Sequence, residues 1–302
     1  MGKLTHKSMS TKRKQQLISW LIMLPGIIMF TFFLWLPLLQ SVRMSFYETK
    51  NIELVKFIGF ENYLKVMRKD DFTQALTNTL SYTFWSLLIG FLVPIFMALV
   101  IGEATKGKGF FRTAAYVPNI LPGLAAVLLW KAFFSGESTG VINILLGSLG
   151  IKPMSFLSEV NLVIPIIVIT ATWKGAGATS LIYMAGLAGV NPELYEAAAI
   201  DGAGVFTRLR SITLPTIFNL GSTLLILQII SIFQIMYEPL VLTAGGPDNA
   251  SMSLMLLMWR YAFGGAMDYG KASAVAVIIA VILLAFTALY TIVDKRKSDS
   301  SY

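Results

Sequence analysis

The sequence predicts an all-α, polytopic membrane protein with six transmembrane helices and a cytoplasmic helix between the fourth and the fifth. Two observations lead to this fold class. Of the 302 residues, 56% are hydrophobic and only 13% are charged, which is about half the charged share of a soluble domain. The apolar residues also gather into runs of roughly 18 or more, the length that crosses a ~30 Å hydrocarbon layer.

Six such runs follow one another, and we interpret them as the spans of a single transmembrane domain, residues 1–302. They cover approximately residues 17–39, 77–102, 113–134, 161–185, 216–240 and 272–293. The fourth contains Lys174, and the fifth contains Gln228, Gln234 and Glu238, so both are more polar than a helix that faces only lipid. Residues 252–263 are apolar but too short to span, which favours a re-entrant or surface segment.

The first run is predicted to be a retained span rather than a cleaved signal peptide. It has a basic flank at residues 12–14, but its apolar stretch of about 23 residues exceeds a signal core, and no small-residue cleavage site follows it.

The distribution of lysine and arginine predicts that both termini are cytoplasmic. With that orientation, the inner segments 1–16, 103–112, 186–215 and 294–302 hold 13 of the 24 basic residues, and the longer outer loops hold nine. An excess of basic residues on the cytoplasmic side is the usual signal of orientation. The outer loop 40–76 weakens the signal, because it carries six basic residues.

Composition also excludes several kinds of chemistry. The chain has no cysteine and one histidine, His6, so thiolate metal sites, a two-histidine metal site and a histidine-based triad are ruled out. A membrane-embedded transferase would need clustered carboxylates or histidines, whereas here the carboxylates are scattered. The net charge of +8 is split among loops and tails, so nucleic-acid binding is not predicted.

The loop 190–215 has the signals of a short helix outside the membrane. Asn191 is a good N-cap and Pro192 suits the first helical position. Gly202 ends the helix where a left-handed conformation is needed. A second short helix, about 205–214, is expected to lead into the fifth span. The loop is either a hairpin that only connects two spans or a docking element for a cytoplasmic partner.

The same loop resembles the EAA loop of the permeases of binding-protein-dependent ABC importers. The resemblance lies in Glu196-Ala197-Ala198, in Asp201-Gly202-Ala203 and in Ile212-Thr213-Leu214-Pro215, with nine residues between Gly202 and Ile212. The family pattern has this spacing.

Further segments resemble the maltose-like carbohydrate-uptake branch of that family. They are 59–63 in the first outer loop, 111–113 before the third span, 140–143, and 243–247 with 270–274 around the last outer loop. The tripeptide Trp173-Lys174-Gly175 resembles permeases for complex oligosaccharides and polysaccharide fragments. The resemblance covers roughly residues 15–295.

The resemblance implies an ATP-driven importer of sugars, most simply oligosaccharides, in a bacterial plasma membrane. This chain would pair with a second homologous six-span permease as a heterodimer, and with two cytoplasmic ATPase subunits and an extracytoplasmic solute-binding protein. The residues implied to couple to the ATPase are Glu196, Ala197, Ala198, Asp201 and Gly202. Glu196 would contact the ATPase surface, and Gly202 would allow the turn between two short helices.

No cofactor or metal is expected on this chain, and ATP and magnesium would be used by the partner ATPase. Two stretches come close to a phosphate-binding loop. The first, 102–109, matches G-x-x-x-x-G-K but has Gly109 where a serine or threonine must hold magnesium. The second, 265–272, fails in the same way at Ala272.

Polar residues inside the spans are candidates for the substrate pathway, because they are costly there unless they line one. Gln228, Ser231, Gln234 and Glu238 fall within about a 120° arc of a helix, and Tyr237 lies just outside it. Such groups suit sugar hydroxyls and sugar C–H faces. The alternative is hydrogen bonding that holds helices together.

Lys174, beside Trp173 in the fourth span, is the most costly residue of the predicted pathway. A lysine at that depth costs ~2.5–3.5 kcal/mol unless it is paired or hydrated. It either faces the pathway and meets an acidic sugar, or forms a structural ion pair with Glu238.

Two other transport functions stay open. An importer of the same build could carry another solute, such as glycerol phosphate or a polyamine, and a secondary transporter would work without an ATPase.

Overall fold

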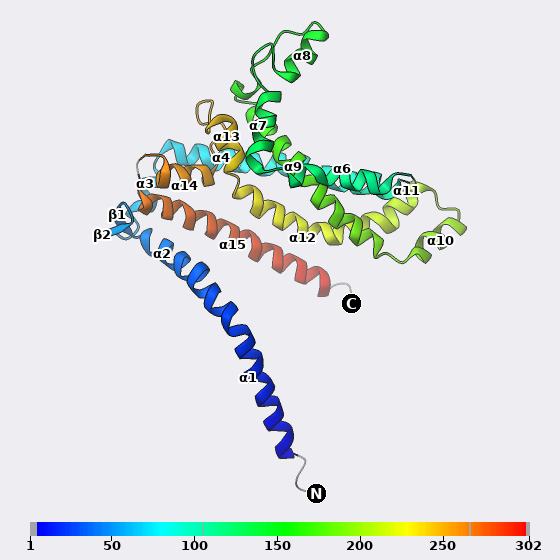
Figure 1. The fold of residues 1–302 in the computed structure, drawn as a ribbon, viewed down its shortest axis with the longest axis horizontal. Coiled ribbons are helices and arrows are strands. Elements are labelled where there is room, and N and C mark those ends of the chain that lie inside the picture. Colours follow the sequence, from blue (N-terminus) through cyan, green and yellow to red (C-terminus); the bar gives the residue numbers. More distant parts are fainter. Residues whose placement is uncertain (1–4, 105, 266, 300–302) are drawn as a thin grey trace.

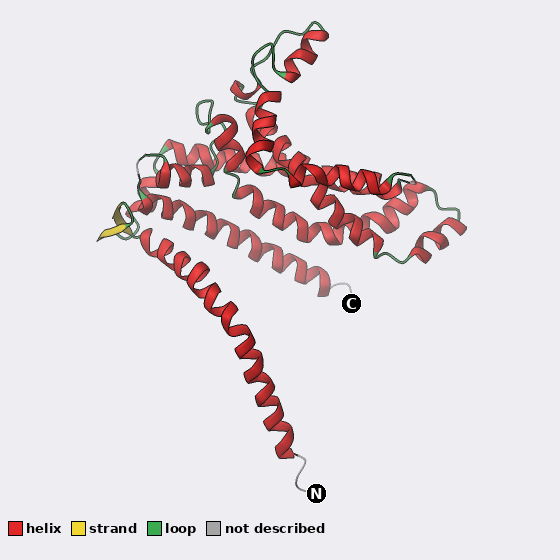
Figure 2. Cartoon of the chain, viewed as in Figure 1, coloured by secondary structure: helices red, strands yellow, loops and turns green. Residues whose placement is uncertain are grey.

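The computed structural model describes residues 5–104, 106–265 and 267–299. Residues 1–4 and 300–302, at the ends of the two predicted tails, lie outside the described residues. The long helices run across Figure 1, between a short hairpin at one end and helix α10 at the other. Helix dominates the described chain, and a single yellow hairpin stands out in Figure 2. The predicted all-α membrane fold is confirmed.

Four helices are each long and apolar enough to cross a membrane, and they correspond to the predicted first, second, fourth and sixth runs. These spans are Lys12–Met44, Asp70–Glu103, Val163–Ala188 and Tyr269–Val293. Their elements are α1 (Thr5–Phe30), η1 (Thr31–Trp35) and α2 (Leu36–Met44); α4 (Asp70–Trp85), η2 (Ser86–Gly90) and α5 (Leu92–Glu103); α9 (Val163–Ala188); and α15 (Tyr269–Asp299). The segments η1 and η2 are π-helical turns within otherwise continuous helices.

The predicted third run, 113–134, is broken rather than straight. Helix α6 (Lys108–Ile120) and helix α7 (Gly123–Phe133) meet at 97°. The break falls at Leu121, whose backbone is extended, because Pro122 disfavours a helical conformation in the residue before it. Helix α7 therefore leaves the direction of the other long helices, as Figure 1 shows.

The predicted fifth run, 216–240, needs correction at both ends. Helix α11 (Val205–Arg208), the π-helical η4 (Leu209–Thr213) and α12 (Leu214–Phe233) follow without interruption, so the expected separate helix 205–214 merges with the span, with a 47° bend. Helix α12 then ends at Phe233, and α13 (Tyr237–Thr243) is a new helix. Pro239 explains the end, because a proline is tolerated in a first turn but not in a helix interior.

Smaller elements join the long helices. On the side opposite α10 lie the antiparallel strands β1 (Tyr47–Lys50) and β2 (Glu53–Phe57), a local departure from the all-α prediction, and α3 (Glu61–Met67). After α7 come α8 (Val141–Ser148) and the 3₁₀ turn η3 (Phe156–Ser158). Helix α14 (Leu254–Phe263) corresponds to the apolar segment that is too short to span.

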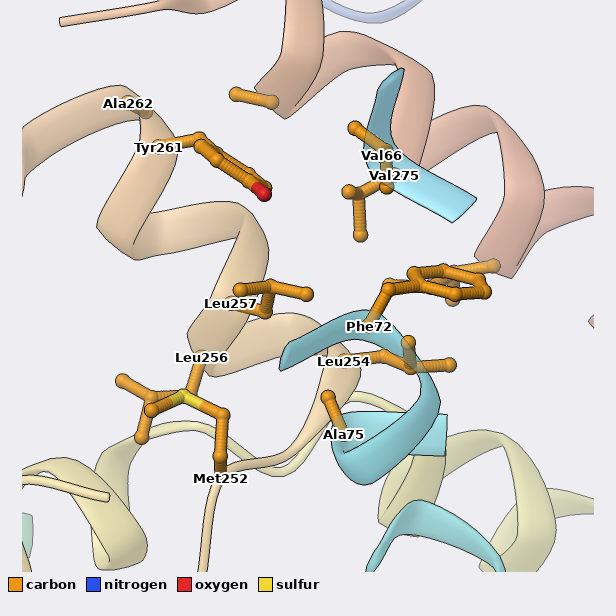
Figure 3. Packing of buried hydrophobic residues seen from close by; sticks show 12 residues of the cluster. Val66, Phe72, Ala75, Met252, Leu254, Leu256, Leu257, Tyr261, Ala262 and Val275 are labelled. Carbon is orange, nitrogen blue, oxygen red and sulfur yellow. The ribbon is translucent and has the colours of Figure 1, made fainter. Parts of the chain in front are cut away.

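A buried cluster joins α3, α4, α14 and α15. In the close view of Figure 3, Phe72 and Ala75 of α4 lie near Leu254 and Leu257 of α14, with Val275 of α15 above them. All five side chains are buried. Helix α14 is therefore packed inside the bundle and is not a surface segment.

Helix α9 lies at the centre of the bundle, where it contacts α4, α5, α6 and α12. Helix α1, in contrast, points away from the rest of the chain (Figure 1). The described side chains of its spanning part are all exposed, which suits an environment of lipid or of a second protein and not of water.

Candidate functional site

The predicted cytoplasmic helix is present as α10 (Pro192–Ile200). The Asn191 side-chain oxygen accepts a hydrogen bond from the Glu193 backbone N–H at 3.1 Å, as an N-cap does. Gly202 has a φ of +76°, a left-handed conformation that a side chain would strain. Both ends of the helix are thus where the local sequence signals placed them.

Helix α10 presents most of the EAA-like segment to its surroundings. Glu196, Ala197, Asp201 and Gly202 are exposed, whereas Ala198 is half-buried. The hydroxyl groups of Tyr195 and Thr213 lie 3.0 Å apart and form a hydrogen bond. This bond ties the exposed helix to η4 at the base of α12.

Two exposed apolar residues near α10 were not singled out from the sequence. Ile200 and Phe206 are each 86% exposed, among the highest values for large apolar side chains in the described chain. The available signal for Phe206 was an apolar pair, Val205-Phe206, in a loop outside the spans and shortly after Gly202. The segment from Glu196 to Phe206, in which most side chains are exposed, is here called the coupling surface.

The predicted pathway residues of the fifth span do meet, although they are not on one helix. Gln228 and Ser231 belong to α12, Gln234 caps its C-terminus, and Tyr237 and Glu238 begin α13. All five line one cavity of about 490 Å³, here called the central cavity. This volume lies within the range of ordinary ligand pockets.

The opposite wall of the central cavity comes from the π-helical turn η2 and from α9. The Gln228 amide donates a hydrogen bond of 2.6 Å to the Ser86 hydroxyl. A methyl group added at Gly90 would lie 2.7 Å from the Gln228 amide nitrogen, so this glycine makes room for the contact. Thr172 and Thr179 of α9 add further hydroxyl groups. The sequence analysis predicted none of these four lining residues, because single small or hydroxyl-bearing residues are common in apolar spans.

Trp173 and Lys174 lie on α9 but do not line the central cavity. The Trp173 ring packs edge-on against Trp130, with 5.6 Å between ring centroids. A methyl group added at Gly123 would lie 3.2 Å from the Lys174 ammonium and 3.5 Å from the Tyr237 ring. Lys174 therefore sits beside Tyr237, behind the wall of the cavity.

The alternative of an ion pair between Lys174 and Glu238 is not realised in this conformation. Within the described parts of the chain, the ion pairs shorter than 4.0 Å are Glu61–Lys65 and Asp268–Lys271. The first lies outside the spans, and the second lies at the start of the last span, Tyr269–Val293. Among the described residues, therefore, no carboxylate oxygen lies within 4.0 Å of the Lys174 ammonium.

Comparison with known proteins agrees with this architecture. Residues 68–299 match the family described as the binding-protein-dependent transport system inner membrane component. The trehalose/maltose transport system permease protein MalF of Thermococcus litoralis is 32% identical over 292 residues, which are 95% of this chain and 97% of that protein.

Two solved structures are similar over almost the whole chain. One is a bacterial ABC transporter involved in the import of the acidic polysaccharide alginate, with a TM-score of 0.85, 29% identity and coverage of 96% of this chain and 99% of that one. The other is the bacterial alginate ABC transporter in complex with an alginate pentasaccharide-bound periplasmic protein, with a TM-score of 0.83, 29% identity and coverage of 95% and 96%.

The fold and the two candidate sites define a helical membrane transport subunit, with a polar cavity between its spans and an exposed helix at one end. The chain belongs to the family of inner membrane components of binding-protein-dependent transport systems. It is a transporter permease subunit and not a catalytic enzyme.

Proposed function

We propose that this chain is the transmembrane subunit of an ATP-driven importer of sugars, most simply oligosaccharides. It forms one half of the translocation pathway and alternates between inward-open and outward-open states. The observation that carries this proposal is the central cavity, where amide and hydroxyl groups from separate segments meet inside an otherwise apolar bundle. Burying such groups is costly unless they bind a partner.

The composition of the central cavity supports a sugar as the solute. Gln228, Gln234 and Ser231 offer donors and acceptors for sugar hydroxyl groups, and the Tyr237 ring offers a face for sugar C–H groups. Relatives named for trehalose and maltose, and structures of alginate importers, support the same class. Trp173 and Lys174 shape the wall from behind, and Lys174 draws an acidic sugar by its charge.

The coupling surface supports a separate ATPase as the source of energy. Glu196 and Asp201 provide exposed charges, and Ala197 and Ala198 keep one face of α10 small enough to enter a groove. Gly202 sets the turn that follows. ATP and magnesium are bound by two cytoplasmic ATPase subunits, and this chain binds no cofactor itself.

The same proposal assigns the two ends of the molecule. The end with α10 and both termini is cytoplasmic, in a bacterial plasma membrane. The end with the β1–β2 hairpin receives the sugar from an extracytoplasmic binding protein. A second homologous permease forms a heterodimer with this chain and completes the other half of the pathway. It covers those exposed helix surfaces that do not face lipid.

The test is reconstitution of the chain with its ATPase and second permease in proteoliposomes that hold ATP and magnesium, with the solute-binding protein added on the outside. We expect uptake of sugar oligomers that stops without ATP. Gly202→Val should abolish uptake and release the ATPase during purification, and Glu196→Lys should do the same. Glu53→Lys, the same charge reversal in the exposed strand β2 at the opposite end of the molecule, is the matched control for ATPase binding and should retain the ATPase during purification.

Two results would contradict the proposal. Uptake that continues in the absence of ATP and of the ATPase would instead support a secondary transporter. Uptake of glycerol phosphate or of a polyamine, but of no sugar, would support an importer of the same build for another solute.

A further inference from the structure

A second hollow lies near the outer end of the chain, apart from the central cavity. It has a volume of about 430 Å³ and is here called the outer groove. The loop after α7 forms one side, and the end of α13 with the loop that follows forms the other. Residues of the groove with polar side chains are Lys131, Ser135, Ser155, Ser158 and Thr243.

The first wall of the outer groove is fixed by one buried side chain, Asn143. Its amide nitrogen donates to the backbone carbonyl groups of Ser135, Glu137 and Met154 at 3.0–3.1 Å. Its amide oxygen accepts a hydrogen bond from the Met154 backbone N–H at 3.0 Å. Asn143 therefore holds the segment 135–137 and the segment around Met154 together in the absence of a ligand.

The second wall is fixed in a similar way by Ser251, which is completely buried. Its hydroxyl group donates to the Gly246 carbonyl oxygen at 2.7 Å and also lies 2.7 Å from the Thr243 hydroxyl. Both walls are already ordered by these hydrogen bonds. Binding of a ligand in the groove therefore loses little conformational entropy in the walls.

Several polar groups of the outer groove are free to bind a ligand. Ser155 and Ser158 are exposed, and neither hydroxyl forms a hydrogen bond to another described residue. The Lys131 ammonium donates one hydrogen bond, of 3.1 Å, to the Val241 carbonyl oxygen, which leaves two of its three N–H donors. Lys131 forms no ion pair with a described carboxylate.

Helix α13 connects the outer groove to the central cavity. Tyr237 and Glu238 at its start line the central cavity, and Leu242 and Thr243 at its end line the outer groove. Six residue steps separate Tyr237 from Thr243, which corresponds to about 9 Å at ~1.5 Å per residue. One extended ligand of several sugar units has the length to contact both ends of this helix.

We propose that the outer groove is a second sugar-binding subsite, which holds the outer end of an oligosaccharide whose inner end lies in the central cavity. The proposal rests on the sugar-import function proposed above. Serine hydroxyl groups and Lys131 bind sugar hydroxyl groups, and Lys131 also accommodates a carboxylate of an acidic sugar. The groove therefore makes import depend on the length of the sugar chain.

The test compares short and long sugars in the assembled importer in proteoliposomes, with maltose and maltopentaose as neutral probes and alginate disaccharide and pentasaccharide as acidic ones. Ser158→Trp fills the groove. We expect the KM for the transported pentasaccharide to rise about tenfold, the effect of losing a few hydrogen bonds, and uptake of the disaccharide to be unchanged. Ser148→Trp, the same change on α8 outside the groove, should alter neither.

A second measurement detects occupancy directly and does not depend on uptake. Since the chain has no cysteine, Ser158→Cys introduces its single thiol. A membrane-impermeant maleimide should label this thiol at least about fivefold more slowly when the pentasaccharide is present, and the disaccharide should not protect it. Labelling of Ser148→Cys should be insensitive to both sugars.

The outcomes separate the two proposals. If the wild-type importer takes up none of the four sugars, the sugar-import function fails. If it takes up a pentasaccharide, but Ser158→Trp affects short and long sugars equally or not at all, or the pentasaccharide leaves labelling of Ser158→Cys unchanged, the outer subsite is refuted and the import function stands.

Discussion

Replacing Gly177 with alanine should destabilise the contact between α6 and α9. Gly177 is buried on α9 where α6 crosses it. A methyl group there would overlap the carbonyl oxygen of Ala115 and would lie 2.5 Å from its carbonyl carbon and 3.1 Å from the Tyr116 nitrogen. These are backbone atoms, so they cannot rotate away as a flexible side chain does.

The magnitude follows from this geometry. Carbon atoms pack at ~3.5–4.0 Å, so the two helices would have to separate by about 1 Å. Overpacking of this kind costs ~1–3 kcal/mol. The better helix propensity of alanine offsets ~0.5–1 kcal/mol. The net expectation for Gly177→Ala is a loss of up to about 2.5 kcal/mol in the free energy of unfolding.

The assay is thermal unfolding of the purified chain in mild detergent, with Gly175→Ala as the matched control. Gly175 lies two residues away on the same helix, and a methyl group there meets nothing within 4 Å. The control should be as stable as wild type or slightly more stable. A Tm of Gly177→Ala equal to or above that of Gly175→Ala would refute the argument that close helix contact requires this glycine.

Three further changes test the sites. Gly90→Ala should push the Gln228 amide from its place in the central cavity and raise the KM for sugar uptake severalfold with little change in Tm; an unchanged KM would contradict this. Tyr195→Phe removes the hydrogen bond to Thr213, worth ~0.5–1.5 kcal/mol, and should lower uptake per ATP hydrolysed; an unchanged ratio would show that the bond does not transmit motion. Asn143→Ala should accelerate amide hydrogen exchange across residues 134–158, since ~1–3 kcal/mol is lost for each buried partner left unsatisfied; wild-type exchange would exclude its role in ordering that loop.

Helix α10 could be predicted in detail because its signals are local. An N-cap at Asn191, a proline at the next position and a glycine at position 202 act within one or two turns of backbone. The structure places α10 between those signals. The hydrogen bond between Tyr195 and Thr213, which connects α10 to the bundle, joins residues 18 positions apart in the sequence. No local sequence pattern predicts this bond.

The central cavity shows the opposite case. An arc on one continuous helix was the basis for grouping Gln228, Ser231, Gln234 and Glu238, yet the helix ends at Phe233. The residues still meet, because only three residues separate the end of α12 from the start of α13, and both of these ends line the same cavity. Ser86 and Gly90 complete the cavity from another span, and a single sequence does not reveal which apolar helices will become neighbours.

The sequence by itself determined the membrane class, the positions of the apolar spans and the helix outside the membrane. The reason is that hydropathy over ~20 residues and capping chemistry over a single turn are properties of contiguous chain. Only the tertiary structure decided where the third and fifth spans break, that Lys174 lies beside Tyr237 and not against Glu238, and that two hollows lie at the ends of α13. Those features depend on packing between distant segments, where a single backbone contact such as Gly177 against Ala115 sets how closely two helices approach.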